Sequence, residues 1–196
     1  MKKLISNILA GFFLVFVSAS AYAVPVIDQN QPNTPNYMAN FLQTNLAQSF
    51  KQAANNVAGA GIFMTSGVGS SDTVTIALWD VLPNAGGSLL ASGSGIATQN
   101  SWFDVFWTPV NVIPDSTLFL VFTSANNNMG ISGDNNNPYS RGQVYANAGF
   151  GTYPIYDYTF RTYAEPAPAS VPEPSSIALL MFGGLMGLFI AKRKVV

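Results

Sequence analysis

The sequence contains no cysteine and no histidine, and charged residues make up only 9% of the chain. Without cysteine, an exported domain cannot be held together by disulfides. Without histidine, the chain lacks the commonest general base, the partner in Ser-His and Cys-His nucleophile pairs, and the usual zinc or copper ligand. These absences argue against most hydrolytic and metal-dependent chemistry and favour a domain that is not an enzyme.

Nucleotide-binding and hydrolase motifs are missing as well. There is no Gly-x-x-x-x-Gly-Lys loop, no Gly-x-Gly-x-x-Gly turn and no Gly-x-Ser-x-Gly elbow. Residues 24–165 hold eight acidic residues but only three basic ones, Lys51, Arg141 and Arg161. Since a mildly acidic surface repels phosphate backbones, nucleic acid is not an expected partner.

The N-terminus is typical of a secretory signal peptide. Lys2 and Lys3 precede an apolar run at residues 8–17, and Ala21-Tyr22-Ala23 forms a small-x-small cleavage site. We therefore expect residues 1–23 to be removed by the secretion machinery. An uncleaved anchor is the alternative, and the shortness of the apolar run argues against it.

Residues 24–163 have the pattern of short strands separated by turns. Within residues 72–79, Val74, Ile76 and Leu78 share one face, as in a half-buried strand. Similar runs recur at residues 57–64, 88–92, 102–107, 117–123, 142–146 and 158–163. This spacing predicts an all-β fold, a jelly-roll-like sandwich, with an immunoglobulin-like Greek key as the alternative.

Several local features complete this prediction. Residues 118–122 are apolar on both faces, as expected of a central strand, and the asparagine-rich residues 126–137 predict a loop. Two prolines within residues 30–36 predict an extended lead-in. The only candidate for a helix in this domain is a short segment within residues 38–46.

The C-terminus combines prolines, an apolar run and a basic end. Four prolines at residues 164–174 favour an extended linker of about 30 Å. Residues 177–191 are uncharged and would rise about 22 Å as a helix, short of the ~30 Å hydrocarbon core. We expect residues 175–196 to form a short transmembrane helix whose basic end stays in the cytoplasm, leaving the domain outside.

This tail resembles the PEP-CTERM sorting signal of Gram-negative bacteria that make exopolysaccharide. The resemblance rests on Pro172-Glu173-Pro174, two following serines, the glycine-interrupted apolar span and the basic end. It implies an exosortase as partner, transient or permanent membrane attachment, and a final place at the cell surface or in the extracellular matrix. A plain single-pass anchor is the alternative. The residues with implied roles are Pro172, Glu173 and Pro174 in recognition, and Lys192, Arg193 and Lys194 as the basic stop.

The exported domain is similar to carbohydrate-binding β-sandwich modules. The similarity rests on Gln48-Ser49-Phe50, Leu78-Trp79-Asp80, Gly87-Ser88-Leu89-Leu90-Ala91, Trp102 with Trp107, and Phe160-Arg161-Thr162-Tyr163. It implies a site that stacks aromatic rings on sugars, and exopolysaccharide as the ligand. The candidate ligand-binding residues are Trp102, Trp107, Tyr139 and Tyr145.

Trp102 and Trp107 are separated by an odd number of residues, so they should face opposite sides of one strand. At most one of the two rings then belongs to the core between the sheets, and the other is a candidate for an exposed stacking platform.

Two other functions stay open. Asp80 and Asp104 could serve as the two carboxylates of a glycan hydrolase if neighbouring strands bring them together. A purely structural adhesin would need no defined ligand. No cofactor is expected, although a structural calcium ion stays open; Asp134-Asn135-Asn136-Asn137 offers oxygen ligands without the EF-hand spacing.

Overall fold

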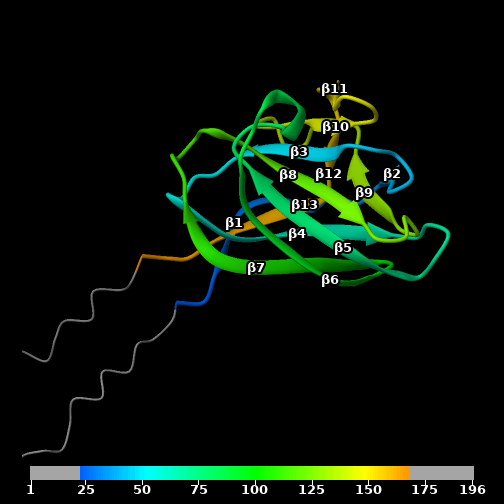
Figure 1. The fold of residues 1–196 in the computed structure, drawn as a ribbon, viewed down its shortest axis with the longest axis horizontal. Coiled ribbons are helices and arrows are strands. Elements are labelled where there is room, and N and C mark those ends of the chain that lie inside the picture. Colours follow the sequence, from blue (N-terminus) through cyan, green and yellow to red (C-terminus); the bar gives the residue numbers. More distant parts are fainter. Residues whose placement is uncertain (1–22, 168–196) are drawn as a thin grey trace, which may run out of the picture. The chain divides into compact units, whose positions relative to one another are not determined.

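The computed structural model of the chain describes residues 23–167. These residues form two antiparallel sheets that pack face to face (Figure 1). One short 3₁₀ helix, η1 (Pro83–Ala85), interrupts the strands. The strands are β1 (Val26–Gln31), β2 (Asn36–Asn40), β3 (Leu46–Lys51), β4 (Asn56–Thr65), β5 (Ser71–Trp79), β6 (Leu89–Thr98), β7 (Ser101–Asn111), β8 (Thr117–Ser124), β9 (Gly130–Asp134), β10 (Val144–Ala146), β11 (Gly151–Tyr153), β12 (Asp157–Tyr158) and β13 (Phe160–Ala164).

The seven-stranded sheet has the order β1-β13-β4-β9-β12, with β2 paired to β9 and β7 paired to β4. The six-stranded sheet has the order β11-β10-β3-β8-β5-β6. The all-β prediction is therefore confirmed for the described residues, and the jelly-roll type stays a prediction. No helix within residues 23–167 has the length and apolar character needed to cross a membrane. The predicted signal peptide and C-terminal transmembrane helix lie outside these residues.

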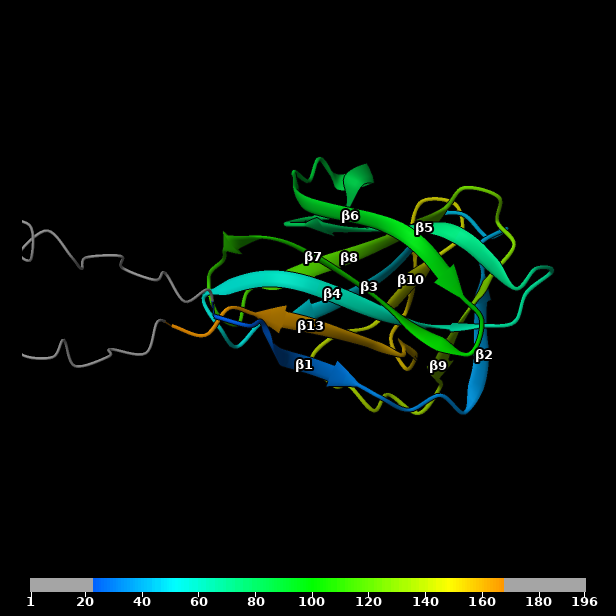
Figure 2. The same cartoon turned by 90° about the horizontal axis from the view of Figure 1, so that it is seen from below.

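The turn between β6 and β7 links the two sheets at one side of the sandwich, since β6 pairs with β5 and β7 pairs with β4 (Figure 2). Glycines let the two strands cross closely. A Cβ at Gly93 would lie 2.7 Å from Cβ of Val105, and one at Gly95 would lie 3.2 Å from the Phe103 ring. Small residues on β6 therefore make room for large side chains of β7 in the core.

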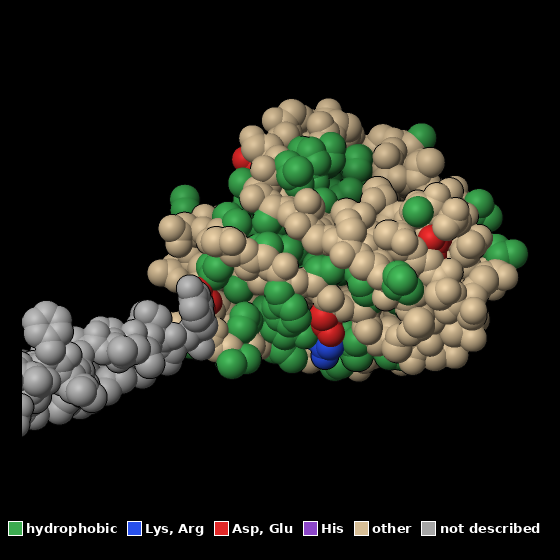
Figure 3. Space-filling model, turned by 60° about the horizontal axis from the view of Figure 1, so that its bottom comes forward, with side chains coloured by type: hydrophobic (Ala, Val, Ile, Leu, Met, Phe, Trp, Pro, Cys, Tyr) green, Lys and Arg blue, Asp and Glu red, His purple; other side chains and the backbone are tan. Residues whose placement is uncertain are grey.

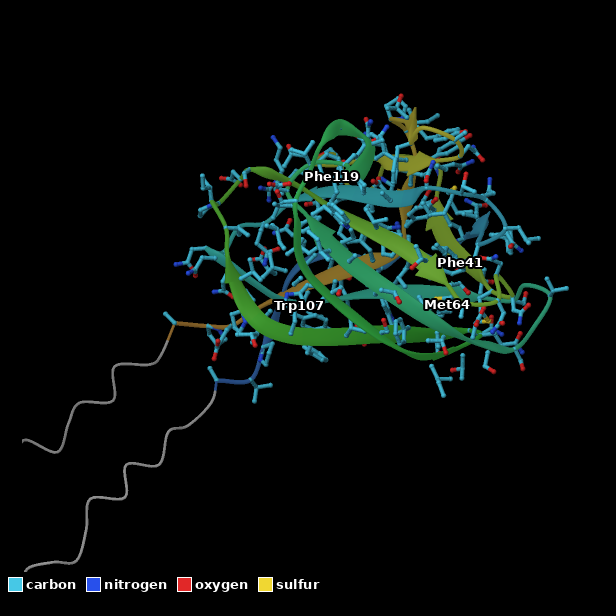
Figure 4. All side chains as sticks on the ribbon, in the orientation of Figure 1. Phe41, Met64, Trp107 and Phe119 are labelled. Carbon is cyan, nitrogen blue, oxygen red and sulfur yellow. The ribbon has the colours of Figure 1, made fainter. Side chains whose placement is uncertain are left out.

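The core follows the alternation expected from the sequence. Val74, Ile76 and Leu78 of β5 are fully buried, as predicted for one face of this strand. The predicted central strand is also confirmed, because β8 lies between β3 and β5. Phe41 and Met64 belong to the same core cluster (Figure 4).

Several elements differ from the prediction. No helix forms within residues 38–46; β2 ends at Asn40, a turn follows, and β3 begins at Leu46. The region 126–137, predicted to be a loop, contains β9. The predicted runs miss β1, β2, β3, β9 and β11, which are short and rich in polar residues or glycine and so lack an apolar alternation that would reveal them.

Buried amide side chains connect the two sheets. Gln48 on β3 is fully buried, and its Nε2 donates to Oδ1 of Asp157 at 2.9 Å. Its Oε1 accepts from the backbone N–H of Tyr158 at 2.8 Å. A second bridge runs from Gln52 Oε1, which accepts from the Thr162 hydroxyl at 2.7 Å. These buried polar side chains are thus paired in the interior.

Asp72, at the start of β5, holds the loop that follows β8. Its carboxylate accepts hydrogen bonds from the Ser124 hydroxyl, from the backbone N–H groups of Asn126 and Asn128, and from Nδ2 of Asn126. Burial alone would raise the pKa of Asp72, but these donors outweigh it and lower the pKa from 3.8 to about 2.

These hydrogen bonds predict that the contribution of Asp72 to stability depends on pH. A lowered carboxyl pKa stabilises the fold fully above about pH 4, and the contribution is lost as pH falls towards 2. We expect Asp72→Asn to lower the free energy of unfolding at pH 7 by about 1–2 kcal/mol, and the difference from wild type to shrink below pH 4. Chemical denaturation across pH would measure it. Asp115→Asn removes an exposed ion pair and is the control with little expected effect. If Asp72→Asn lowered the free energy of unfolding equally at all pH values, the proposed role of the Asp72 carboxylate would be contradicted.

Candidate functional site

The outer face of the seven-stranded sheet carries aromatic and charged side chains from β7 and β13. Alternation along β7 buries Phe103 and Val105, so Trp102, Asp104 and Phe106 point outward. On β13 the fully buried Thr162 separates two outward side chains. We call the residues Trp102, Asp104, Phe106, Arg161 and Tyr163 the outer-face cluster.

An ion pair lies at the centre of the outer-face cluster. Nε of Arg161 donates to Oδ1 of Asp104 at 2.7 Å, and Nη2 donates to Oδ2. The Tyr163 hydroxyl donates to the same carboxylate at 2.9 Å. Both charged side chains are about one-fifth exposed. The bidentate geometry fixes the guanidinium and leaves its Nη1 without a hydrogen-bond acceptor among the described residues.

Protonation states in the cluster follow from this pairing. The hydrogen bond to Asp104 raises the pKa of Arg161, although burial opposes that shift. Burial, together with the hydrogen bond to Asp104, raises the pKa of Tyr163 to about 12. The guanidinium therefore stays charged and the phenol stays protonated throughout the physiological range.

Aromatic rings border the ion pair on both sides. The Arg161 guanidinium carbon lies 4.1 Å from the centre of the Trp102 ring, and Trp102 contacts Phe63 edge to face. On the other side, the Phe106 and Tyr163 rings lie 4.8 Å apart. The space-filling view shows adjoining acidic and basic side chains bordered by hydrophobic ones (Figure 3).

Two glycines of β4 form the floor beneath the cluster. A Cβ at Gly61 would lie 2.0 Å from Oδ1 of Asp104, and one at Gly59 would lie 2.8 Å from the Phe106 ring. Because neither glycine carries a side chain, residues of β7 and β13 can meet across the strand that separates them. The glycines thus allow the ion pair to form.

The predicted ligand-binding residues are spread over the molecule. Trp102 lies on the outer face, while Trp107 packs against the core and donates Nε1–H to the Val57 carbonyl at 3.0 Å (Figure 4). The two rings thus face opposite sides, as expected. Tyr139 is buried, and its hydroxyl donates to Oε1 of Gln29. Tyr145 lies on the other sheet, where its ring contacts Phe119 edge to face.

Sequence reasoning missed Arg161 as a partner of Asp104. The two residues are 57 positions apart and lie on strands that are both paired with β4. No local signal marks this contact, because it depends on the registers of three strands. From the sequence, only the alternation along β7 could have placed Asp104, beside Trp102, on the outer face.

The two carboxylates considered for hydrolysis have separate partners. Asp80 follows β5 of the six-stranded sheet and accepts from the Ser88 N–H at 2.6 Å, whereas Asp104 is bound to Arg161 on the other sheet. Within residues 23–167, no group of three acidic side chains is arranged to hold a metal ion. Asp134 instead accepts from Asn136 and Asn33. A structural calcium ion stays an open alternative.

The residues expected in sorting, Pro172, Glu173, Pro174 and the basic stop, lie outside the described residues. Comparison with known families nevertheless identifies their segment. Residues 170–194 match the PEP-CTERM protein-sorting motif. No curated protein and no solved structure matches the chain.

The PEP-CTERM motif indicates an exported protein that an exosortase sorts, with association to the membrane of a Gram-negative bacterium. It spans only the tail and therefore assigns no activity to the sandwich. The similarity of the sandwich to carbohydrate-binding modules stays a prediction.

The glycine floor of the outer-face cluster can be tested through stability. Gly61→Ala should displace the Asp104 carboxylate and lower the free energy of unfolding by about 1–2 kcal/mol, since it separates a partly buried ion pair. In an Asp104→Ala background the same change should cost almost nothing. A double-mutant cycle by chemical denaturation measures this coupling. Equal costs in both backgrounds would show that Gly61 has another role.

Proposed function

We propose that the sandwich is a non-enzymatic glycan-binding domain of a protein that its PEP-CTERM signal delivers to the cell surface or extracellular matrix. The proposed ligand is the exopolysaccharide of the host cell. The observation that carries this proposal is the outer-face cluster, in which an ion pair lies between aromatic rings outside the hydrophobic core.

Stacking surface is available at one end of the cluster. The Phe106 side chain is 56% exposed although it lies on a central stretch of β7, where it contacts Tyr163. An exposed aromatic ring on a sheet face offers its apolar surface to the C–H groups of a sugar ring. Trp102 contributes less open surface, because Arg161 covers one face of its ring.

The ion pair supplies the hydrogen bond to sugar hydroxyls. The guanidinium of Arg161 is held in place by Asp104 and stacked on Trp102, so it loses little freedom when its Nη1 donates to a ligand. A fixed donor between two aromatic surfaces is suited to a sugar ring, which has an apolar C–H face and hydroxyl groups at its edge. The arrangement therefore supports binding along the sheet face.

The same contacts favour binding over hydrolysis. Both oxygens of Asp104 already accept hydrogen bonds from Arg161. A glycosidase needs two carboxylates placed on either side of the scissile bond. Asp80, the second candidate, belongs to the end of a strand in the other sheet. We therefore propose a binding role, in which the carboxylate orients the guanidinium.

The net charge favours a neutral polymer. Residues 24–165 carry eight acidic and three basic side chains, and two of the three cations are paired with aspartates. A strongly anionic polysaccharide would therefore meet repulsion without compensating cations. Recognition through ring stacking and hydrogen bonds needs no opposite charge on the ligand.

Retention on the exopolysaccharide of the host tests the proposal. We expect Phe106→Ala and Trp102→Ala each to weaken binding about tenfold, because each removes an aromatic contact of roughly 1–2 kcal/mol. Affinity electrophoresis in gels containing the polymer measures this effect. Ile96→Ala, which removes an apolar side chain that is 76% exposed on β6, is the matched control. Unchanged mobility of wild type in the polymer gel would refute the proposal.

Cleavage of the tail can be tested separately. We propose that the exosortase cuts near the Pro172-Glu173-Pro174 motif, so the mature protein should run from about Val24 to about Ser175. Intact-mass measurement of protein from cells with and without the exosortase decides this question. A mass that includes Val196 in both strains would instead support a permanent anchor.

A further inference from the structure

A second candidate site lies away from the outer-face cluster. A half-open hollow of about 220 Å³ occurs where β2 and the turn after it meet β10, β11 and β12. Its apolar lining comes from Met38, Ala39, Val144 and Ala146. The volume lies below the ~300–1,000 Å³ of sites for drug-sized ligands, so it suits one small ring.

One polar group of the hollow has no partner. Tyr158 lines the hollow and is fully buried, and its hydroxyl forms no hydrogen bond within residues 23–167. Burial, followed by the neighbouring Tyr153, raises the pKa of Tyr158, so its hydroxyl stays protonated and can donate. Buried hydroxyls are normally satisfied, so an unpaired one on a residue that lines the hollow points to a missing polar partner.

The remaining polar lining consists of neutral groups. Nδ2 of Asn147 donates to the Tyr153 hydroxyl at 2.7 Å, and Gln43 contacts the same asparagine at 3.5 Å. The rings of Tyr153 and Tyr156 stack nearly parallel, with centres 5.8 Å apart. No charged side chain lines the hollow. Flat aromatic surface, amides and a free hydroxyl together match a small, uncharged ring that carries hydroxyl groups.

We propose that this hollow binds one neutral pyranose residue at the end of a glycan, with the Tyr158 hydroxyl donating to a sugar hydroxyl. A hollow of this volume holds a single ring and therefore suits a terminal residue, whereas the open sheet face suits the interior of a chain. This inference rests on the proposed function only in taking a glycan as the ligand. It does not depend on the outer-face cluster.

The test uses the mature protein and the methyl glycosides of glucose, galactose and mannose as probes. Nuclear magnetic resonance titration should show one of these glycosides binding, with intermolecular contacts from its ring protons to Tyr153 and Tyr156. Tyr158→Phe should weaken this binding about tenfold, because the ligand loses one hydrogen bond. Without ligand, the same variant should melt at the wild-type temperature or above it, since it loses only an unpaired hydroxyl.

Tyr37→Phe is the matched control, because Tyr37 is exposed and does not line the hollow, so the change should leave binding unchanged. Equal affinity of Tyr158→Phe and wild type, or no glycoside bound, would overturn the inference. If Tyr158→Phe fails to fold, the intermolecular contacts from the glycoside to Tyr153 and Tyr156 in the wild type decide whether the hollow binds the sugar.

The two proposals can be refuted independently. Binding of a glycoside at the hollow without retention on the polymer would keep this inference and remove the proposed function of the outer-face cluster. Retention that depends on Phe106, with no glycoside at the hollow, would do the reverse.

Discussion

The buried amide of Gln48 joins the two sheets, and much of the molecule is arranged around it. The side chain leaves β3 of the six-stranded sheet and reaches Asp157 and the backbone of Tyr158 on β12. Asp157 in turn accepts from the backbone N–H of Tyr139. Burial raises the pKa of Asp157 although both donors oppose the shift. A polar group buried this deeply needs every partner, so the contacts fix how the segment at 153–158 enters the sandwich.

This anchoring affects both candidate sites. Tyr158 follows Asp157 directly and lines the hollow, and β13 begins two residues later, bringing Arg161 and Tyr163 to the outer face. The order of side chains along this stretch therefore determines which rings enter the core and which remain outside. Phe160 packs edge to face on Tyr139 in the interior, while Arg161 beside it stacks on Trp102 outside. The polar contacts of Gln48 and Asp157 thus position both the structural residues and the candidate binding residues of this segment.

Sequence reasoning recovered the parts of the fold that depend on local alternation. The apolar face of β5 and the central place of β8 are readable, because burial repeats every second residue or affects both faces. Strands such as β1, which carries the buried Gln29 and Gln31, are stabilised by distant hydrogen bonds and show no such pattern. The same limit applies to the site: alternation separated Trp102 from Trp107, but register across β7, β4 and β13 brought Asp104 to Arg161.

Scarcity of charge links the sandwich to the route its tail specifies. Arg141 is paired with Asp115 and Arg161 with Asp104, so two of the three cations of the domain are engaged within it. Such a surface has little long-range attraction for anionic partners, and its affinity must come from short-range contacts. Exposed rings, asparagine and glutamine amides, and a buried hydroxyl are contacts of this kind. Under the proposed function, each such contact with a neutral sugar would be weak, and contacts with many copies of one repeating unit along a polymer would add up.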